Sequence, residues 1–148
     1  MKHVLPLLIE RAQAQRDRQA AAARQARQSA VQAESTLQRL GEFRGECLSR
    51  SAGAQLGRAD GASLAGYQVF VGRLDAAIGL QAREATLRAG HADDQQQRLL
   101  QQQRRVLAFE ALASRDALER SRREQRRDQR TTDDFAARAA APDQDPFE

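Results

Sequence analysis

Proline is confined to the two ends of this 148-residue chain, and that placement limits the possible folds more than any other feature. The prolines are Pro6, Pro142 and Pro146, so residues 7–141 lack the one residue that reliably breaks a helix interior. Ala, Arg, Gln, Leu and Glu, which favour helices, dominate that stretch. The alternating β-branched and aromatic runs typical of strands are absent from the sequence. We therefore expect an all-α chain with very long helices.

The supply of large apolar side chains limits how those helices pack. Aromatic residues make up 4% of the chain, there is no Trp, and Ala is the commonest of the hydrophobic residues. A chain with this composition cannot fill a thick core, because too little apolar surface is available to offset the entropy of ordering it. We expect the apolar side chains to be buried along a narrow seam between two paired helices.

Glycine marks one internal break. Six of the nine glycines lie between Gly41 and Gly66, in a stretch that also contains Ser and Asp and few large apolar residues. We predict two long helices in an antiparallel coiled-coil hairpin, with helix two extending beyond helix one. The expected boundaries within a single domain of residues 1–148 are helix one over about 3–50, a turn over about 51–62, helix two over about 63–140, and a disordered tail over 141–148.

Heptad spacing, in which seam residues recur in steps of three and four, supports the pairing. In helix two the spacing is unbroken from Val71 to Ala113. Its positions are Val71, Leu74, Ile78, Gln81, Ala85, Arg88, Ala92, Gln95, Leu99, Gln102, Val106, Phe109 and Ala113. In helix one the same spacing links Ala26, Ala30, Ala33, Leu37, Leu40 and Cys47. An earlier set, Leu5, Leu8 and Ala12, is out of step with it, so we predict a stutter near Ala26.

Folding the chain about Gly57 places residue n opposite residue 114 minus n. The expected apolar pairs are Leu40 with Leu74, Phe43 with Val71, Cys47 with Tyr67, Leu8 with Val106 and Leu5 with Phe109. Between these ends, Ala20 to Ala33 faces Gln81 to Asp94, which predicts a thin, weakly packed and bendable waist. Helix two continues after helix one has ended, so we expect the segment from about Leu112 to Ala140 to lack an intramolecular partner.

The sequence contains no residue pattern typical of a catalytic, metal-binding or phosphate-binding site. His3 and His91 are isolated, and the neighbours of His91 in the run HADD point around a helix rather than toward one face. No phosphate-binding loop follows the glycines, and the single Cys47 excludes an internal disulfide. No apolar run approaches the ~20 residues that span a bilayer, and the N-terminal apolar stretch is too short for a secretory signal. We predict a cytoplasmic protein that is not an enzyme, needs no cofactor or metal, and does not insert into membranes.

The positive charge concentrates in the segment without an expected partner. The net charge of the chain is +4. The segment from Arg115 to Arg130 contains seven Arg and four acidic residues, so its own net charge is 7 − 4 = +3. The interleaved acids and the lack of aromatic side chains in this stretch make it a poor nucleic-acid site. An acidic protein surface is the favoured target. A basic coiled coil that binds nucleic acid remains an alternative of a different class, as does a freestanding chaperone.

Two segments carry a resemblance to a known family. Residues 67–78, YQVFVGRLDAAI, follow the turn, and residues 128–139, DQRTTDDFAARA, lie near the C-terminus. Together with the length, they resemble the FliJ family of flagellar type III export proteins, and the resemblance covers essentially the whole chain. Proteins of this family look like the central stalk of a rotary ATPase, which implies a role in building the bacterial flagellum and in motility.

The resemblance implies specific partners. The paired termini would enter the export ATPase hexamer, with contacts from Arg122, Arg123, Arg126, Arg127 and Phe135. The membrane export-gate protein would contact Phe70, Leu74, Ala77 and Gln81, although the family pattern has His where Gln81 stands. The steps between these four are also seam spacing, so a core role competes. Export chaperones are further implied partners, and the implied location is the cytoplasmic side of the flagellar base. The equivalent stalk of a virulence-type secretion system is the nearest alternative.

Overall fold

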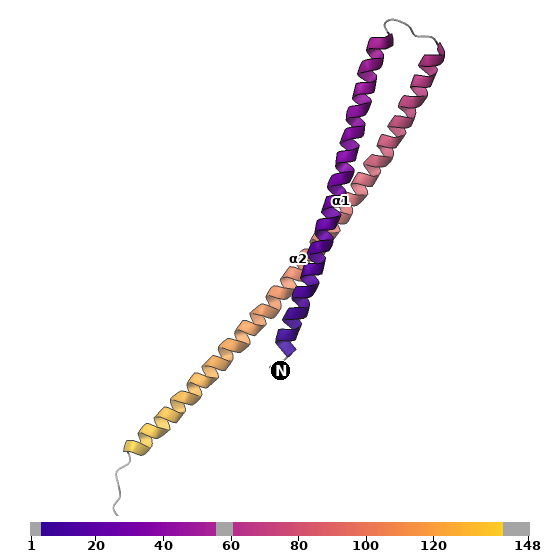
Figure 1. Ribbon diagram of the computed structural model, residues 1–148. Helices are drawn as coiled ribbons and strands as arrows, with labels where there is room; N and C mark the ends of the chain where they lie inside the picture. Colours follow the sequence, from indigo (N-terminus) through magenta and orange to yellow (C-terminus); the bar gives the residue numbers. More distant parts are fainter. Residues whose placement is uncertain (1–3, 56–60, 141–148) are drawn as a thin grey trace, which may run out of the picture. The chain divides into compact units, whose positions relative to one another are not determined.

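The chain forms two long helices in the computed structural model, which describes residues 4–55 and 61–140, with side chains described for 4–51 and 61–140. Helix α1 spans Val4–Gln55 and helix α2 spans Gly61–Ala140 (Figure 1). Every described residue is helical, so the all-α prediction is confirmed, and α2 is the longer helix. The expected tail at 141–148 and most of the expected turn lie outside the described residues.

Helix α1 ends later than expected. It continues to Gln55 rather than stopping near residue 50. No proline interrupts residues 51–55, and a single helical glycine costs only about 1 kcal/mol relative to alanine. The composition of this stretch therefore weakens the helix without ending it.

Two compact units make up the chain. Among the described residues, one contains residues 13–55 and 61–103, and the other contains residues 4–12 and 104–140. Within the first unit, the segments of α1 and α2 run side by side in opposite directions (Figure 1). This arrangement confirms an antiparallel helical hairpin.

The seam of α2 follows the predicted heptad. All thirteen predicted positions from Val71 to Ala113 are buried or half-buried. Leu74, Ala85 and Val106 are the most deeply buried, at 9%, 6% and 3% exposure. The regular step of three and four keeps these residues on one side of the helix, which is why one unbroken stripe packs along the hairpin.

The seam of α1 is also unbroken, and the predicted stutter near Ala26 is wrong. Ile9, not Leu8, is half-buried, and Ala23 is buried where the stutter required Ala22. Steps of four and three then run from the N-terminal turn to Cys47. The positions are Leu5, Ile9, Ala12, Arg16, Gln19, Ala23, Ala26, Ala30, Ala33, Leu37, Leu40, Arg44 and Cys47, all buried or half-buried.

The predicted pair of Phe43 with Val71 is wrong, because Arg44 takes the seam position. Phe43 was expected opposite Val71, but it remains 48% exposed. Arg44 occupies the heptad position instead, and its side chain turns outward to form an ion pair with Asp75 of α2. A long arginine can do this because its aliphatic stem covers apolar surface while the guanidinium stays in water.

Hydrogen bonds across residues 13–103 confirm the predicted register. The Tyr67 hydroxyl donates to the Cys47 carbonyl at 3.5 Å, and the Gln81 side-chain amide donates to the Ala33 carbonyl at 3.1 Å. The Gln19 amide donates to the Gln95 side-chain oxygen at 2.6 Å. Each pair consists of residue n and residue 114 minus n. The pairs Leu40–Leu74 and Leu5–Phe109 stay predictions, although their side chains are buried or half-buried. Leu8, at 39% exposure, lies outside the seam.

The middle of the hairpin has a thin seam, as predicted. Its most buried side chains are small: Ala23, Ala26, Ala33 and Ala85. No described side chain of any kind is less than 2% exposed. Alanines and glutamines therefore hold the helices together here, through close approach and hydrogen bonds rather than through large apolar contacts. Whether this waist bends stays a prediction.

Candidate protein-interaction surface

The C-terminal part of α2 is bare. Every residue from Ser114 to Ala140 is exposed, and we refer to this segment as the overhang. Leu118 and Phe135 are exposed within it, Phe135 at 74%. Exposed apolar side chains on a helix that covers nothing else are typical of a surface that another molecule covers. No described part of the chain does so.

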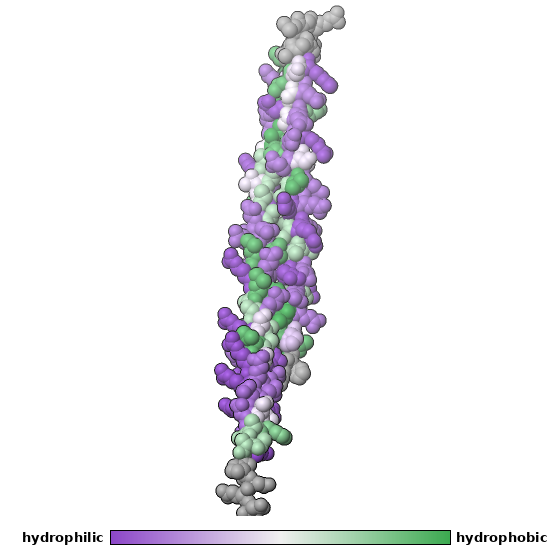
Figure 2. Space-filling view, turned by 90° about the vertical axis from the view of Figure 1, so that its left-hand side faces the viewer, coloured by the Kyte–Doolittle hydropathy of each residue, from purple (hydrophilic) through white to green (hydrophobic). Residues whose placement is uncertain are grey.

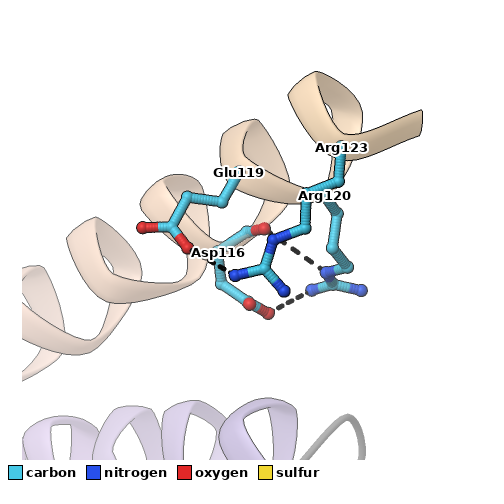
Figure 3. Close-up of polar contacts among 4 residues, drawn as sticks. All are labelled: Asp116, Glu119, Arg120 and Arg123. Atoms are coloured by element: carbon cyan, nitrogen blue, oxygen red, sulfur yellow. Dashed lines mark hydrogen bonds and ion pairs between the residues drawn. The ribbon is translucent and has the colours of Figure 1, made fainter. Parts of the chain in front are cut away.

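Ion pairs along the overhang stay within the helix. Asp116 pairs with Arg120, and Glu119 pairs with Arg123 at 3.4 Å (Figure 3). Both pairs have the i, i+4 spacing that places two side chains next to each other on a helix. Each is worth only a few tenths of a kcal/mol on an exposed helix, so they support the helical form without fixing the overhang to anything.

The heptad of α2 does not stop where the seam stops. Counting on from Ala113 in steps of three and four gives Asp116, Arg120, Arg123, Arg127, Arg130 and Asp134. The stripe that packs along the hairpin is therefore continued by an arginine row, which we define as Arg120, Arg123, Arg127 and Arg130. Arg127 and Arg130 form no ion pair with any described residue. The row presents positive charge where an apolar seam would continue.

The predicted ring-contact residues are all exposed, but they do not share one side of the helix. A helix turns about 100° per residue. Arg123 and Arg127 belong to the arginine row, Arg122 and Arg126 lie beside it, and Phe135 projects from another side. Figure 2 shows an almost continuous hydrophilic stretch followed by a short apolar cluster before the grey end, where residues 135–140 read FAARAA. Arg120 and Arg130 were missed, although the continued heptad would have found them.

The four predicted gate-contact residues divide into two pairs. Leu74 and Gln81 lie in the seam, where Leu74 is 9% exposed and Gln81 donates to α1. Phe70, at 44% exposure, and Ala77 are exposed. The structure does not bring all four to one accessible side. The exposed pair is joined by Leu80, three residues after Ala77 and also exposed, which sequence reasoning missed. We call Phe70, Ala77 and Leu80 the outer stripe.

Electrostatics near the outer stripe centre on one ion pair between the helices. A hydrogen bond from Arg44 lowers the pKa of the Asp75 carboxyl, against a smaller opposing effect of burial. The same hydrogen bond raises the pKa of Arg44. Both side chains are well exposed to water, which screens the interaction. The pair therefore marks the register more than it stabilises the fold.

Residues 4–55 and 61–140 contain neither a metal-site cluster nor a candidate membrane span. No group of three His, Cys, Asp or Glu side chains there could hold a metal ion. Neither helix is apolar enough over a sufficient length to cross a bilayer. Cys47 is half-buried in the seam, as expected for a small apolar side chain.

These features define a class of protein: an antiparallel coiled-coil hairpin whose longer helix carries a bare cationic end. Over residues 1–144 the chain matches the family described as flagellar FliJ protein, and it belongs to that family. Membership supports a role related to flagellar type III export. No match was found among curated proteins or among solved structures.

Proposed function

We propose that the chain is the central stalk of the flagellar export ATPase, with the overhang held inside the hexameric ring. One observation carries this proposal: α2 replaces its seam by the arginine row at the point where its side chains cease to be buried. Charged residues at seam positions oppose coverage by an apolar helix, because burying them without partners is costly. A ring lined by acidic side chains supplies those partners, and it also encloses a single helix from all sides.

A ring that surrounds the overhang would explain why the proposed contact residues lie on different sides of the helix. Arg122, Arg123, Arg126 and Arg127 spread over one half of the overhang, and Phe135 projects from another side. A flat partner would cover only one of these sides. A ring has no such limit, so all five residues become contact residues at once.

The outer stripe is the proposed contact for the membrane export-gate protein. Phe70, Ala77 and Leu80 are exposed on the part of α2 that follows the turn, far in sequence from the overhang. Leu74 and Gln81 act indirectly in this proposal, because their seam contacts fix which side of α2 faces outward. The same chain would then contact both the ring and the gate. The protein would work on the cytoplasmic side of the inner-membrane flagellar base and would also escort export chaperones.

The test is to mix the protein with the export ATPase and to measure ATP hydrolysis and hexamer formation. The wild-type chain should raise both. The double variant Arg123→Glu, Arg127→Glu should lose the effect, because it reverses the charge of the arginine row. The matched control is Arg24→Glu with Arg27→Glu, two exposed arginines of α1 that lie outside the seam. Circular dichroism confirms that both variants remain helical. An inactive wild-type chain, or equal losses in both variants, would refute the stalk role.

A further inference from the structure

One line of residues on α2, outside the seam, carries two leucines where a paired helix normally carries polar side chains. Arg73, Leu80, Leu87 and Asp94 follow one another at intervals of seven, so they lie in a row along the helix. All four are exposed, Leu80 at 65% and Leu87 at 69%. The side of a helix away from its packed face is usually polar, so the packing of α2 on α1 does not explain these leucines. We call the four residues the leucine row.

The two ends of the leucine row carry opposite charges. Neither Arg73 nor Asp94 forms an ion pair with any described residue. When the row is laid against a second copy of itself in the opposite direction, residue n comes level with residue 167 minus n. Arg73 of each copy then faces Asp94 of the other, and Leu80 of each copy faces Leu87 of the other. In the same direction, like charges would meet at both ends.

The residues beside the leucine row fit the same arrangement. Arg83 and Glu84 lie between the two leucines, and each arginine comes level with the glutamate of the other copy. Glu84 pairs with Arg88 of its own helix at 2.6 Å, whereas Arg83 has no ion-pair partner among the described residues. Gly90 comes level with Ala77, so two small residues face each other there. A Cβ atom added at Gly90 would meet nothing within 4 Å, so that side of α2 is open to a second helix.

We infer that two copies of this chain pair in opposite directions through the leucine row of α2, with the two-fold axis between Arg83 and Glu84. Both copies use the same surface, as in other symmetric dimers. The leucines drive the pairing, because it removes exposed apolar area from water. The charges at the ends fix the direction and the register. Arg73 and Asp94 are only about 32 Å apart along the helix, at 1.5 Å per residue, so the interface is small and the dimer weak.

This inference goes beyond the proposed stalk role and stands without it. Leu80 belongs both to the leucine row and to the outer stripe. A chain paired with a second copy would therefore not expose its whole outer stripe, and pairing would compete with the proposed gate contact. The dimer is tested with the protein alone, so its absence would leave the stalk proposal unaffected.

Sedimentation equilibrium of the full-length chain at low ionic strength measures the pairing, over about 5 μM to about 500 μM, a range suited to a small interface. The average mass of the wild-type chain should rise from that of a monomer toward that of a dimer. Leu80→Glu should weaken the pairing at least about tenfold, because it places a charge against Leu87 of the second copy. A wild-type chain that stays monomeric over the whole range would overturn the inference.

The matched control for this variant is Leu107→Glu. Leu107 has nearly the same exposure, 64%, and lies outside the leucine row. The dissociation constant of the dimer should stay within about twofold of the wild-type value, as expected for a surface change away from the contact. Circular dichroism checks that both variants remain helical. Equal weakening by the two variants would show that the leucine row is not the contact.

Charge reversal tests the direction of the pairing. Arg73→Glu or Asp94→Arg alone places like charges together at both ends of the dimer, and each should weaken the pairing about tenfold at low ionic strength. An equal mixture of the two variants, or a chain that carries both changes, restores opposite charges and should pair as strongly as the wild type. Pairing in the same direction would leave both single variants unchanged, since like charges meet before and after the change. Unchanged single variants, or no recovery in the mixture, would overturn the antiparallel contact.

Discussion

The Gln81 side chain donates a hydrogen bond to the backbone carbonyl of Ala33, 3.1 Å away across the seam and 48 positions earlier in the chain. This contact changes the role of Gln81. Sequence resemblance made it a residue that the export gate touches directly, yet its amide is engaged by the other helix. In the proposed contact with the export gate, a residue in that position would act only by setting the rotation of α2.

Replacing Gln81 by leucine should therefore stabilise the protein. An apolar side chain at a half-buried seam position avoids the cost of partly desolvating an amide, and we expect a gain of about 1 kcal/mol in the free energy of unfolding. Urea denaturation followed by circular dichroism measures the change. The control is Gln97→Leu on the exposed side of α2, which should stay within about 0.5 kcal/mol. A destabilised Gln81→Leu variant would show that the hydrogen bond to Ala33 outweighs the apolar gain.

Phe70 and Leu74 should separate gate binding from stability. Phe70→Ser removes an exposed ring, so the free energy of unfolding should change by less than about 0.5 kcal/mol while binding to the export-gate protein weakens. Leu74→Ala removes a buried side chain and should cost about 2 kcal/mol, the low end for such a change, because the seam is thin. Titration calorimetry with the gate protein and urea denaturation provide the two readouts. Weaker gate binding by Leu74→Ala than by Phe70→Ser, with helicity intact, would contradict the assignment of the outer stripe.

Much of the fold follows from the heptad alone. In α2 the spacing runs through thirteen positions without a competing choice, because apolar residues lie on either side of the polar middle and define the phase. The register then follows from where the glycines fall. In an antiparallel hairpin, the residue numbers of two facing residues add up to a constant. Three hydrogen bonds between the helices join residues whose numbers add up to 114.

The heptad pattern alone does not determine which residues of α1 lie in the seam. Leu8 and Ile9 are adjacent and equally apolar, so local composition does not decide which one enters the seam. The deciding residues are Arg16 and Arg44, which occupy seam positions by burying their stems. A pattern that treats arginine as polar skips both positions. For the same reason, it assigns a core role to Phe43 and misses the continuation of the seam into the arginine row.

The ion pair of Arg44 with Asp75 gives the hairpin a small dependence on pH. The folded pKa of Asp75 is lowered by the hydrogen bond from Arg44. Its stabilising contribution is therefore present above the usual carboxylate pKa and is lost as the pH falls through the lowered value. Asp75→Asn removes the charge at every pH. We expect the wild-type chain to melt above this variant at neutral pH and level with it in strong acid, as thermal melts over that range would show. A constant difference between the two proteins would rule out the linkage.

Removing the overhang should separate export function from folding. Residues 114–140 are all exposed, so they bury no side chain whose loss would expose a core. A chain that ends at Ala113 should therefore melt within a few degrees of the full-length protein, since a shift of one kcal/mol in a domain of this size moves the melting temperature by about 2–4 °C. Its helical signal should fall in proportion to the residues removed. ATPase stimulation should be lost completely, as it should be in the charge-reversed arginine row. A truncated chain that melts far below the full-length protein would mean that the overhang packs on the hairpin in solution, and the cationic end could then not be free to enter a ring.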